Sequence, residues 1–132
     1  MSELVCYQSW EIPKVWDKVK DHIEKALKYR GSNYSLDDIY AGLRKSEMQL
    51  WASQGKDLEA ALVTTIQVKD DMKFCLFLAL GGTNLKKWDS WQSYIENWAR
   101  KEGCEEMRIY GRIGWAKIVN YKIDYTKMSK KL

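Results

Sequence analysis

The most apolar stretch of the chain is the run of residues 74–80, which ends at two consecutive glycines, Gly81 and Gly82. A short run without polar positions is typical of a strand that is buried on both faces of a sheet. The glycines break this strand, and a strongly periodic helix is predicted to follow from about residue 85 to residue 102. The sequence therefore predicts a central strand with an amphipathic helix directly after it.

The segments around this unit alternate in period and predict further helices and strands. Short polar turns before and after residues 60–68 predict a meander of antiparallel strands. Gly103 stands where a helix C′ glycine belongs, and the strand after it should lie parallel to the central strand through a right-handed crossover. The predicted helices are Pro13–Tyr29, Ser35–Lys45, Leu85–Glu102 and Ile113–Asn120, and the predicted strands are Met48–Ser53, Ala60–Val68, Lys73–Leu80, Cys104–Tyr110 and Lys122–Lys130.

The resulting order, α-α-β-β-β-α-β-α-β, predicts an α+β fold with a mixed, mainly antiparallel sheet flanked by helices. The 132 residues contain no repeat, linker or low-complexity segment, so a single domain over residues 1–132 is expected. Much of the net charge of +4 lies near the C-terminus, at Lys122, Lys127, Lys130 and Lys131, and elsewhere the signs are interspersed, which argues against a nucleic-acid-binding protein. With three cysteines, no CxxC spacing and one histidine, His22, no metal site is expected.

The glycine pair and the helix after it form an arrangement that can bind an anion. Glycines allow backbone amides to approach a ligand, and a helix N-terminus offers free N–H groups and positive potential. A simple strand–turn–helix connection explains the same pattern. In the next strand Arg108, Tyr110 and Arg112 alternate, which indicates either contact with an acidic ligand or a paired, half-exposed strand face.

The second half of the chain carries a series of motifs at fixed spacing, namely Gly81-Gly82, Ile95-Glu96-x-Trp98-Ala99-Arg100-x-x-Gly103-Cys104 and Gly111-Arg112-x-Gly114-Trp115. Together with two N-terminal helices and a strand meander, this series resembles the acetyltransferase-like (GNAT-type) proteins of tailed bacteriophages. The motifs cover about the last two-thirds of the chain, and the first third matches by element order.

The resemblance implies a GNAT-like fold and a site for acetyl-coenzyme A. Carried over, the residues that bind the cofactor would be Leu78, Leu80, Gly81, Gly82, Thr83 and Asn84. The resemblance also implies a general acid at Tyr121 and a base at Glu59. The sequence departs from the family pattern at the phosphate-binding turn, because Gly-Gly-Thr-Asn-Leu-Lys-Lys replaces a turn that begins with Gln or Arg and has a Gly-x-Gly core.

Three functions fit these observations. The first is a phage GNAT-fold protein with a degenerate coenzyme site, acting as a virion-associated or assembly component with phage structural proteins or a host protein as partners. The second is an acetyl-coenzyme A-dependent N-acetyltransferase that acts on a host or phage amine. The third is an adaptor that binds another protein through exposed tryptophans. A place in the virion or the host cytoplasm is expected, since no signal peptide or transmembrane run is found, and oligomerisation is left open.

Overall fold

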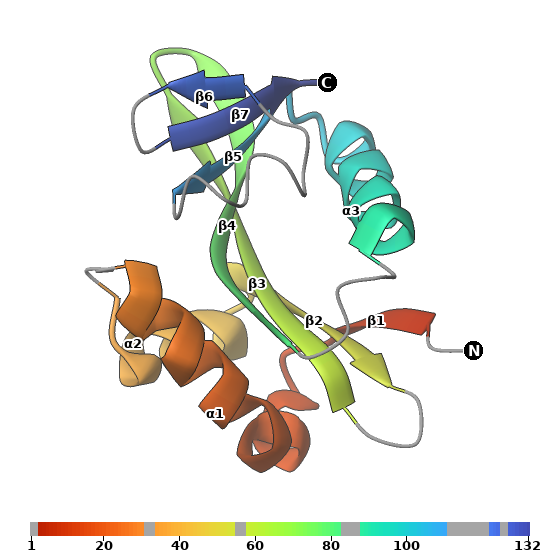
Figure 1. Ribbon diagram of the computed structural model, residues 1–132. Helices are drawn as coiled ribbons and strands as arrows, with labels where there is room; N and C mark the ends of the chain where they lie inside the picture. Colours follow the sequence, from red (N-terminus) through yellow and green to blue (C-terminus); the bar gives the residue numbers. More distant parts are fainter. Residues whose placement is uncertain (1–2, 31–33, 55–57, 83–87, 111–121, 125–126) are drawn as a thin grey trace.

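The computed structural model describes residues 3–30, 34–54, 58–82, 88–110, 122–124 and 127–132. Within these residues, the strands form one mixed sheet and the helices pack against it, so the predicted α+β class is confirmed (Figure 1). The elements are β1 (Glu3–Tyr7), α1 (Ile12–Arg30), α2 (Leu36–Arg44), β2 (Met48–Gln54), β3 (Leu58–Lys69), β4 (Met72–Gly82), α3 (Trp88–Lys101), β5 (Glu106–Tyr110), β6 (Lys122–Asp124) and β7 (Lys127–Lys131).

The seven described strands lie in the order β1-β2-β3-β4-β5-β7-β6. Strands β2, β3 and β4 form the predicted antiparallel meander. Strands β4 and β5 are parallel and are joined through α3, as the crossover prediction requires. The predicted central strand therefore lies in the middle of the sheet, with three strands on each side of it.

Two parts of the predicted element order are wrong. Strand β1 was not predicted, because this five-residue strand forms an edge of the sheet and pairs with β2 alone among the described strands. The single strand predicted for Lys122–Lys130 is a hairpin of two antiparallel strands, β6 and β7, whose weak alternation of apolar residues gives no sign of the reversal. The helix predicted at Ile113–Asn120 lies outside the described residues.

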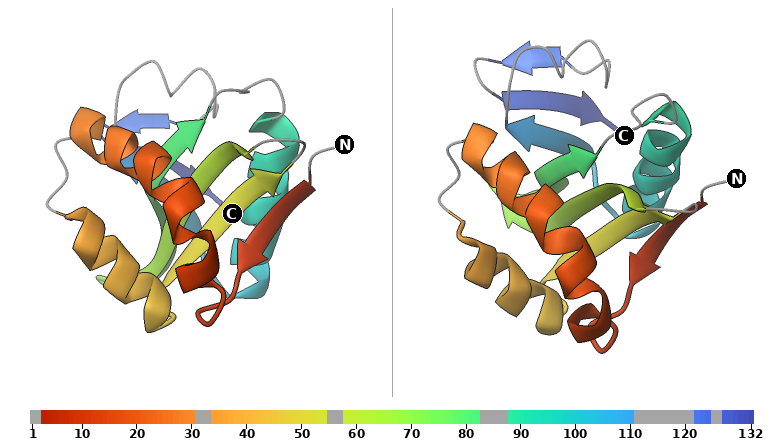
Figure 2. Two further views of the ribbon diagram at one scale, coloured as in Figure 1. Left: turned by 90° about the horizontal axis from the view of Figure 1, so that it is seen from below. Right: turned by 60° about the horizontal axis from the view of Figure 1, so that its bottom comes forward.

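The sheet is covered on both faces. Helices α1 and α2 lie on one face and α3 lies on the other (Figures 1 and 2). Under α1 and α2 the core contains Ile12, Val19, Ile23, Ile39, Leu43, Leu50, Val63, Phe74, Leu76, Leu78 and Ala79. Under α3 it contains Trp51, Leu62, Cys75, Phe77, Trp91, Ile95, Ala99, Cys104, Met107 and Ile109.

Local signals in the sequence fix the ends of two helices. Ser35 caps α2 as predicted: its hydroxyl accepts from the Asp38 amide at 3.1 Å, and the Asp38 carboxylate accepts from the Ser35 amide at 2.9 Å. Hydrogen bonds to the carboxylate from the backbone and the side chain of Ser35 lower the pKa of Asp38. Gly103 follows α3 with a φ of 87°, a left-handed conformation that glycine adopts at little cost.

Candidate functional site

The two parallel strands at the centre of the sheet separate before β4 ends. The β4–β5 ladder runs through four residue pairs, from Phe74↔Glu106 to Phe77↔Ile109. Strand β4 then continues to Gly82, and its pairing with β3 continues with it to Ala60↔Gly82. Figure 1 shows β5 parting from β4 at this level. Beyond Phe77, β4 therefore continues without a partner on this side among the described residues, since β5 is described only to Tyr110.

A β-bulge lies at the point of divergence. The β3–β4 register passes from Thr64↔Phe77 to Val63↔Ala79, so that Leu78 is the extra residue on β4. Leu78 and Ala79 are both buried in the core under α1 and α2. A bulge bends its strand and increases the local twist, so it explains why β4 turns away from β5 here.

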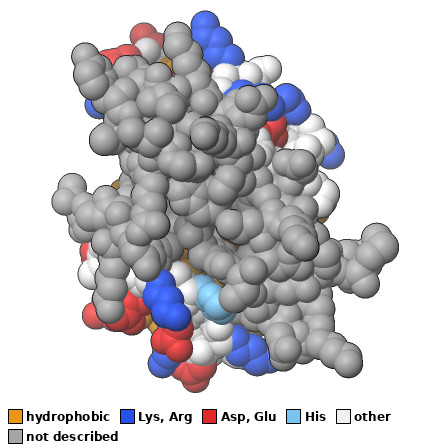
Figure 3. All heavy atoms as spheres, in the orientation of Figure 1, with side chains coloured by type: hydrophobic (Ala, Val, Ile, Leu, Met, Phe, Trp, Pro, Cys, Tyr) orange, Lys and Arg blue, Asp and Glu red, His pale blue; other side chains and the backbone are white. Residues whose placement is uncertain are grey.

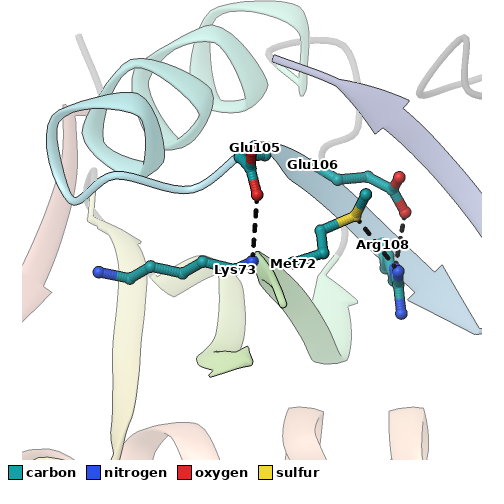
Figure 4. Close-up of polar contacts among 5 residues, drawn as sticks. All are labelled: Met72, Lys73, Glu105, Glu106 and Arg108. Carbon is teal, nitrogen blue, oxygen red and sulfur yellow. Dashed lines mark hydrogen bonds and ion pairs between the residues drawn. The ribbon is translucent and has the colours of Figure 1, made fainter. Parts of the chain in front are cut away.

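The opposite end of the same strand pair is held closely, where α3 leads into β5. The Glu105 amide donates to the Lys73 carbonyl at 2.8 Å, and the Lys73 amide donates to Oε2 of Glu105 at 3.4 Å (Figure 4). The Lys73 ammonium donates to the Glu102 carbonyl at 2.5 Å. The C-terminal end of α3 is thereby attached to the start of β4. We call this region the closed end of the β4–β5 pair, and the region beyond Phe77 and Ile109 the open end.

Arg108 belongs to the closed end and not to a ligand-facing stripe. Its Nε donates to Oε1 of Glu106 at 2.6 Å, and its guanidinium lies 3.9 Å from the centre of the Phe74 ring. Its Nη2 lies 3.6 Å from the sulfur of Met72 (Figure 4). Of the two interpretations of this strand face, the paired and partly buried one holds for Arg108. Arg112 lies outside the described residues.

Four of the six residues predicted to bind the cofactor lie on one stretch of β4. Leu78, Leu80, Gly81 and Gly82 follow the end of the β4–β5 ladder, and all four belong to the open end. The other two, Thr83 and Asn84, lie outside the described residues.

The backbone places Glu59 at the same end of the sheet. The β2–β3 register passes from Ser53↔Ala60 to Gln54↔Leu58, which makes Glu59 a second irregularity in the sheet. Its neighbour Ala60 pairs with Gly82. The predicted base therefore lies one residue from the strand position opposite the predicted phosphate-binding glycines. The predicted acid, Tyr121, lies outside the described residues.

Helix α3 runs back along the sheet, antiparallel to β4. Its last turn reaches the closed end, as the bond between Lys73 and the Glu102 carbonyl shows, so the first described turn of the helix lies toward the open end. A helix N-terminus carries unsatisfied N–H groups and partial positive charge. This orientation is the one that the anion-binding prediction required of the helix.

Two buried polar residues of α3 were not predicted to be functional. Gln92 and Glu96 are 8% and 4% exposed, and Gln92 donates to Glu96 at 2.8 Å. They stand next to the apolar positions Trp91 and Ile95, one helical turn apart, so they share the face that meets the sheet. Their spacing along the apolar stripe is the signal that could have identified them.

The described cysteines do not form an activated thiolate. Burial raises the pKa of Cys6 to about 11, with a further contribution from Glu11. Burial also raises the pKa of Cys75, with Cys104 adding to the effect and a hydrogen bond to Thr64 opposing it. The pKa of Cys104 is raised by burial as well. All three side chains are neutral thiols at pH 7, so none is poised as a nucleophile.

The structure also bears on the other functional classes. Within the described ranges, no group of three or more His, Cys, Asp and Glu residues could hold a metal ion, and no helix is long and apolar enough to cross a bilayer. Basic and acidic side chains are mixed on the described part of the face in Figure 3. Of the tryptophans with described side chains, Trp51 and Trp91 are buried, Trp16 and Trp98 are half-buried, and Trp10 is 71% exposed. Among these described tryptophans, only Trp10 is exposed, so they do not form the cluster of exposed rings that an adaptor of this kind would need.

Comparison with solved structures shows the same architecture in acetyltransferases. A probable acetyltransferase has a TM-score of 0.70 at 12% identity, over 93% of this chain and 92% of its own. The PaiA N-acetyltransferase from Thermoplasma acidophilum, solved in complex with coenzyme A, has a TM-score of 0.68 at 14% identity, over 100% and 99% of the two chains. An aminoglycoside acetyltransferase from an uncultured soil metagenomic sample, in complex with sisomicin, has a TM-score of 0.67 at 9% identity, over 93% and 90%.

No protein-family model matches the chain, and no curated protein matches it either. At these identities the likeness to solved structures shows the fold. The predicted GNAT-like fold is therefore confirmed, in its mixed sheet and in the helices that flank it. A phage origin, a place in the virion and the identity of any partner stay predictions, since none of these findings bears on them.

Proposed function

We propose that this protein is an acetyl-coenzyme A-dependent N-acetyltransferase, which transfers an acetyl group to the amine of a second substrate. The observation that carries the proposal is the divergence of β4 from β5 beyond Phe77 and Ile109, with a bulge in β4 at the same level. The strands part in a fold that this chain shares with acetyltransferases, one of them a coenzyme A complex.

The residues at the open end suit the shape and charge of coenzyme A. Five residues of β4, from Leu78 to Gly82, extend past the β4–β5 ladder, which gives an elongated ligand a length of backbone to lie along. The strand ends in two glycines, and α3 directs its N-terminus to the same end. Glycine amides and a helix N-terminus are groups that bind phosphate oxygens. We place the pyrophosphate near Gly81 and Gly82, and the thioester near Leu78 to Leu80.

When bound, acetyl-coenzyme A would supply an acetyl group that is already activated as a thioester. The protein would contribute mainly by positioning, together with backbone amides that face the carbonyl oxygen as negative charge develops on it. The attacking amine must be neutral, and its proton passes to solvent or, through water, to Glu59, our candidate base, which lies beside the position opposite Gly82. Tyr121 is our candidate to protonate the departing sulfur.

The state of the thiols favours direct transfer. A covalent acyl-enzyme route needs a nucleophile with a lowered pKa, whereas the pKa values of Cys6, Cys75 and Cys104 are all raised. We therefore expect both substrates to bind before the acetyl group moves, so that steady-state kinetics show intersecting lines and not a ping-pong pattern.

The test is calorimetric titration of the protein with acetyl-coenzyme A, using Gly82→Trp as the disabling variant. A bulky ring at the end of β4 should block the ligand, so we expect micromolar binding by the unaltered protein and its loss in the variant. Val68→Trp is the matched control: it adds the same ring to the same hairpin, at a position that is 68% exposed and near the closed end.

Thermal unfolding of both variants shows whether each one is folded. No binding at millimolar coenzyme by the unaltered protein would refute the proposal. Binding that survives in a folded Gly82→Trp variant would refute the proposed location of the site. A positive result justifies a screen of amines with release of the coenzyme thiol as the readout.

A further inference from the structure

Glu96 is a carboxylate buried in the middle of α3. Only 4% of the residue is exposed, and its two oxygens have different partners. Oε2 accepts from the side-chain amide of Gln92 at 2.8 Å, and Oε1 accepts from the ammonium of Lys130 at 2.7 Å. A carboxylate so far from water persists only with charge-assisted hydrogen bonds of this kind. The contact with Lys130 therefore joins this face of α3 to β7.

Lys130 connects the helix to the far half of the sheet. It belongs to β7, where it pairs with Met107 of β5, and Met107 pairs in turn with Cys75 of β4. These three residues form a row across β7, β5 and β4. The last β4–β5 pair, Phe77↔Ile109, is only two residues further along β5. The contact between Glu96 and Lys130 thus lies just inside the level at which the strands diverge.

The other side of α3 is bound to the near half of the sheet. Trp91 and Ile95 belong to the same core cluster as Trp51 of β2 and Leu62 of β3. The ring of Trp98 meets that of Trp51 edge-on, with the ring centres 5.1 Å apart. One helix therefore contacts β2 and β3 through apolar packing and β7 through an ion pair, and Met107 and Ile109 of β5 share its apolar cluster. It spans both halves of the sheet beside the open end.

We propose that Glu96 and Lys130 are positioning residues that fix α3 across the divergence of the sheet. Apolar packing alone permits a helix to slide or rotate by small amounts, whereas an ion pair to a buried carboxylate is confined by the distance and angle of its hydrogen bond. By holding α3 to β7, the pair sets how the helix N-terminus faces the open end of β4. The effect of this pair on coenzyme binding rests on the function proposed above. Its effect on the position of α3 does not depend on that function.

The first measurement is amide hydrogen exchange on the protein without ligand. In Glu96→Gln and Lys130→Met we expect the α3 amides to exchange about tenfold faster than in the unaltered protein, because a fastened helix opens less often than an unfastened one. Lys130→Arg keeps the charge and should restore slow exchange. The matched control is Val19→Ala, which removes buried methyl groups under α1 and lowers stability without touching α3.

If exchange in α3 rises no more in Glu96→Gln and Lys130→Met than in Val19→Ala at equal global stability, the pair has no positioning role and the inference is wrong. The second measurement is the Kd for coenzyme A, which we expect to rise about tenfold in Glu96→Gln and less than twofold in Val19→Ala. An equal loss of coenzyme affinity in Glu96→Gln and Val19→Ala would overturn the proposed role of the pair in coenzyme binding. If the unaltered protein binds no coenzyme, the proposed function fails. The exchange rates alone then decide whether the pair holds α3 in position.

Discussion

The closed and the open end of the β4–β5 pair are built from the same two strands and are held in opposite ways. At the closed end, two hydrogen bonds between Lys73 and Glu105 and the contacts of the Arg108 guanidinium with Phe74 and Met72 tie the strands together. At the open end the β4–β5 ladder stops at Phe77, and a bulge bends β4. The comparison shows that two strands can separate at one end while the sheet stays intact, because the four β4–β5 pairs and the β3–β4 ladder keep their register.

The largest effect is expected at the last pair before the divergence. Phe77 is 1% exposed under α3, and Phe77→Ala should lower the free energy of unfolding by about 3–5 kcal/mol, because it leaves a cavity that the neighbours fill only partly. Urea unfolding measures the loss. Val68→Ala in the adjacent strand is the control, since its 68% exposure predicts a change within about 0.5 kcal/mol. A similar change in both variants would contradict the packing described for the open end.

Breaking the ion pair at the closed end should have the next largest effect. Glu106 and Arg108 have side chains that are 10% and 14% exposed, so Arg108→Met leaves a nearly buried carboxylate without its partner. We expect a loss of about 2–3 kcal/mol in the free energy of unfolding. The double variant Arg108→Met/Glu106→Gln should recover part of it. Coenzyme binding by the folded Arg108→Met protein should be unchanged, and a lost site would show that the two ends are not independent.

The N-terminal cap of α2 lies outside both ends of the β4–β5 pair, so a variant there serves as a reference for the stability changes above. Ser35→Ala removes a hydrogen bond of the capping box and should cost about 1 kcal/mol at pH 7. The pKa of Asp38 is lowered in the folded protein, so its contribution is complete above the ordinary value of 3.8 and is lost as the pH falls through the lowered value. The difference in Tm between the two proteins should therefore narrow only once the pH falls below 3.8. A difference that stays constant would mean that Asp38 does not depend on the cap.

The smallest effect is expected at the hairpin that joins β3 and β4 near the closed end. Lys69 pairs with Met72, and the two residues between them, Asp70 and Asp71, have φ values of 53° and 64°. A two-residue turn with both φ values positive favours glycine at the second position. Asp71→Gly should therefore raise the free energy of unfolding by about 0.5 kcal/mol. Chemical unfolding of the two proteins side by side checks the sign, and a loss of stability would mean that Asp71 makes a favourable contact.

Most of the sheet could be predicted because its signals are local. The apolar run at 74–80 fixed the central strand, and the polar turns fixed the meander beside it. The periodic stripe of α3 and Gly103 fixed the crossover helix and its end. The edge strand β1 could not be read in the same way, because its described partner, β2, is distant in sequence. The hairpin of β6 and β7 was missed because the weak alternation of its apolar residues gives no sign of the reversal.

In the candidate site too, the features with local sequence signals could be predicted and those that depend on the sheet register could not. The glycine pair was visible in the sequence as the end of a buried strand, and its place at the open end follows from that. The bulge at Leu78 was not visible, since the register of β4 against β3 depends on packing on both faces of the sheet. The placement of Glu59 opposite the end of β4 also needed the sheet register, because Glu59 and Gly82 are far apart along the chain.

The sequence by itself determined which segments are helices and strands in the centre of this protein, and where the central strand ends in glycine. Periodicity and turn residues carry that information because they act over a few neighbouring residues. Only the tertiary structure decided that β4 and β5 part after four pairs, and that Glu96 of α3 binds Lys130 of β7 beside the gap. Those contacts join residues more than thirty positions apart, and only the packed sheet brings them together.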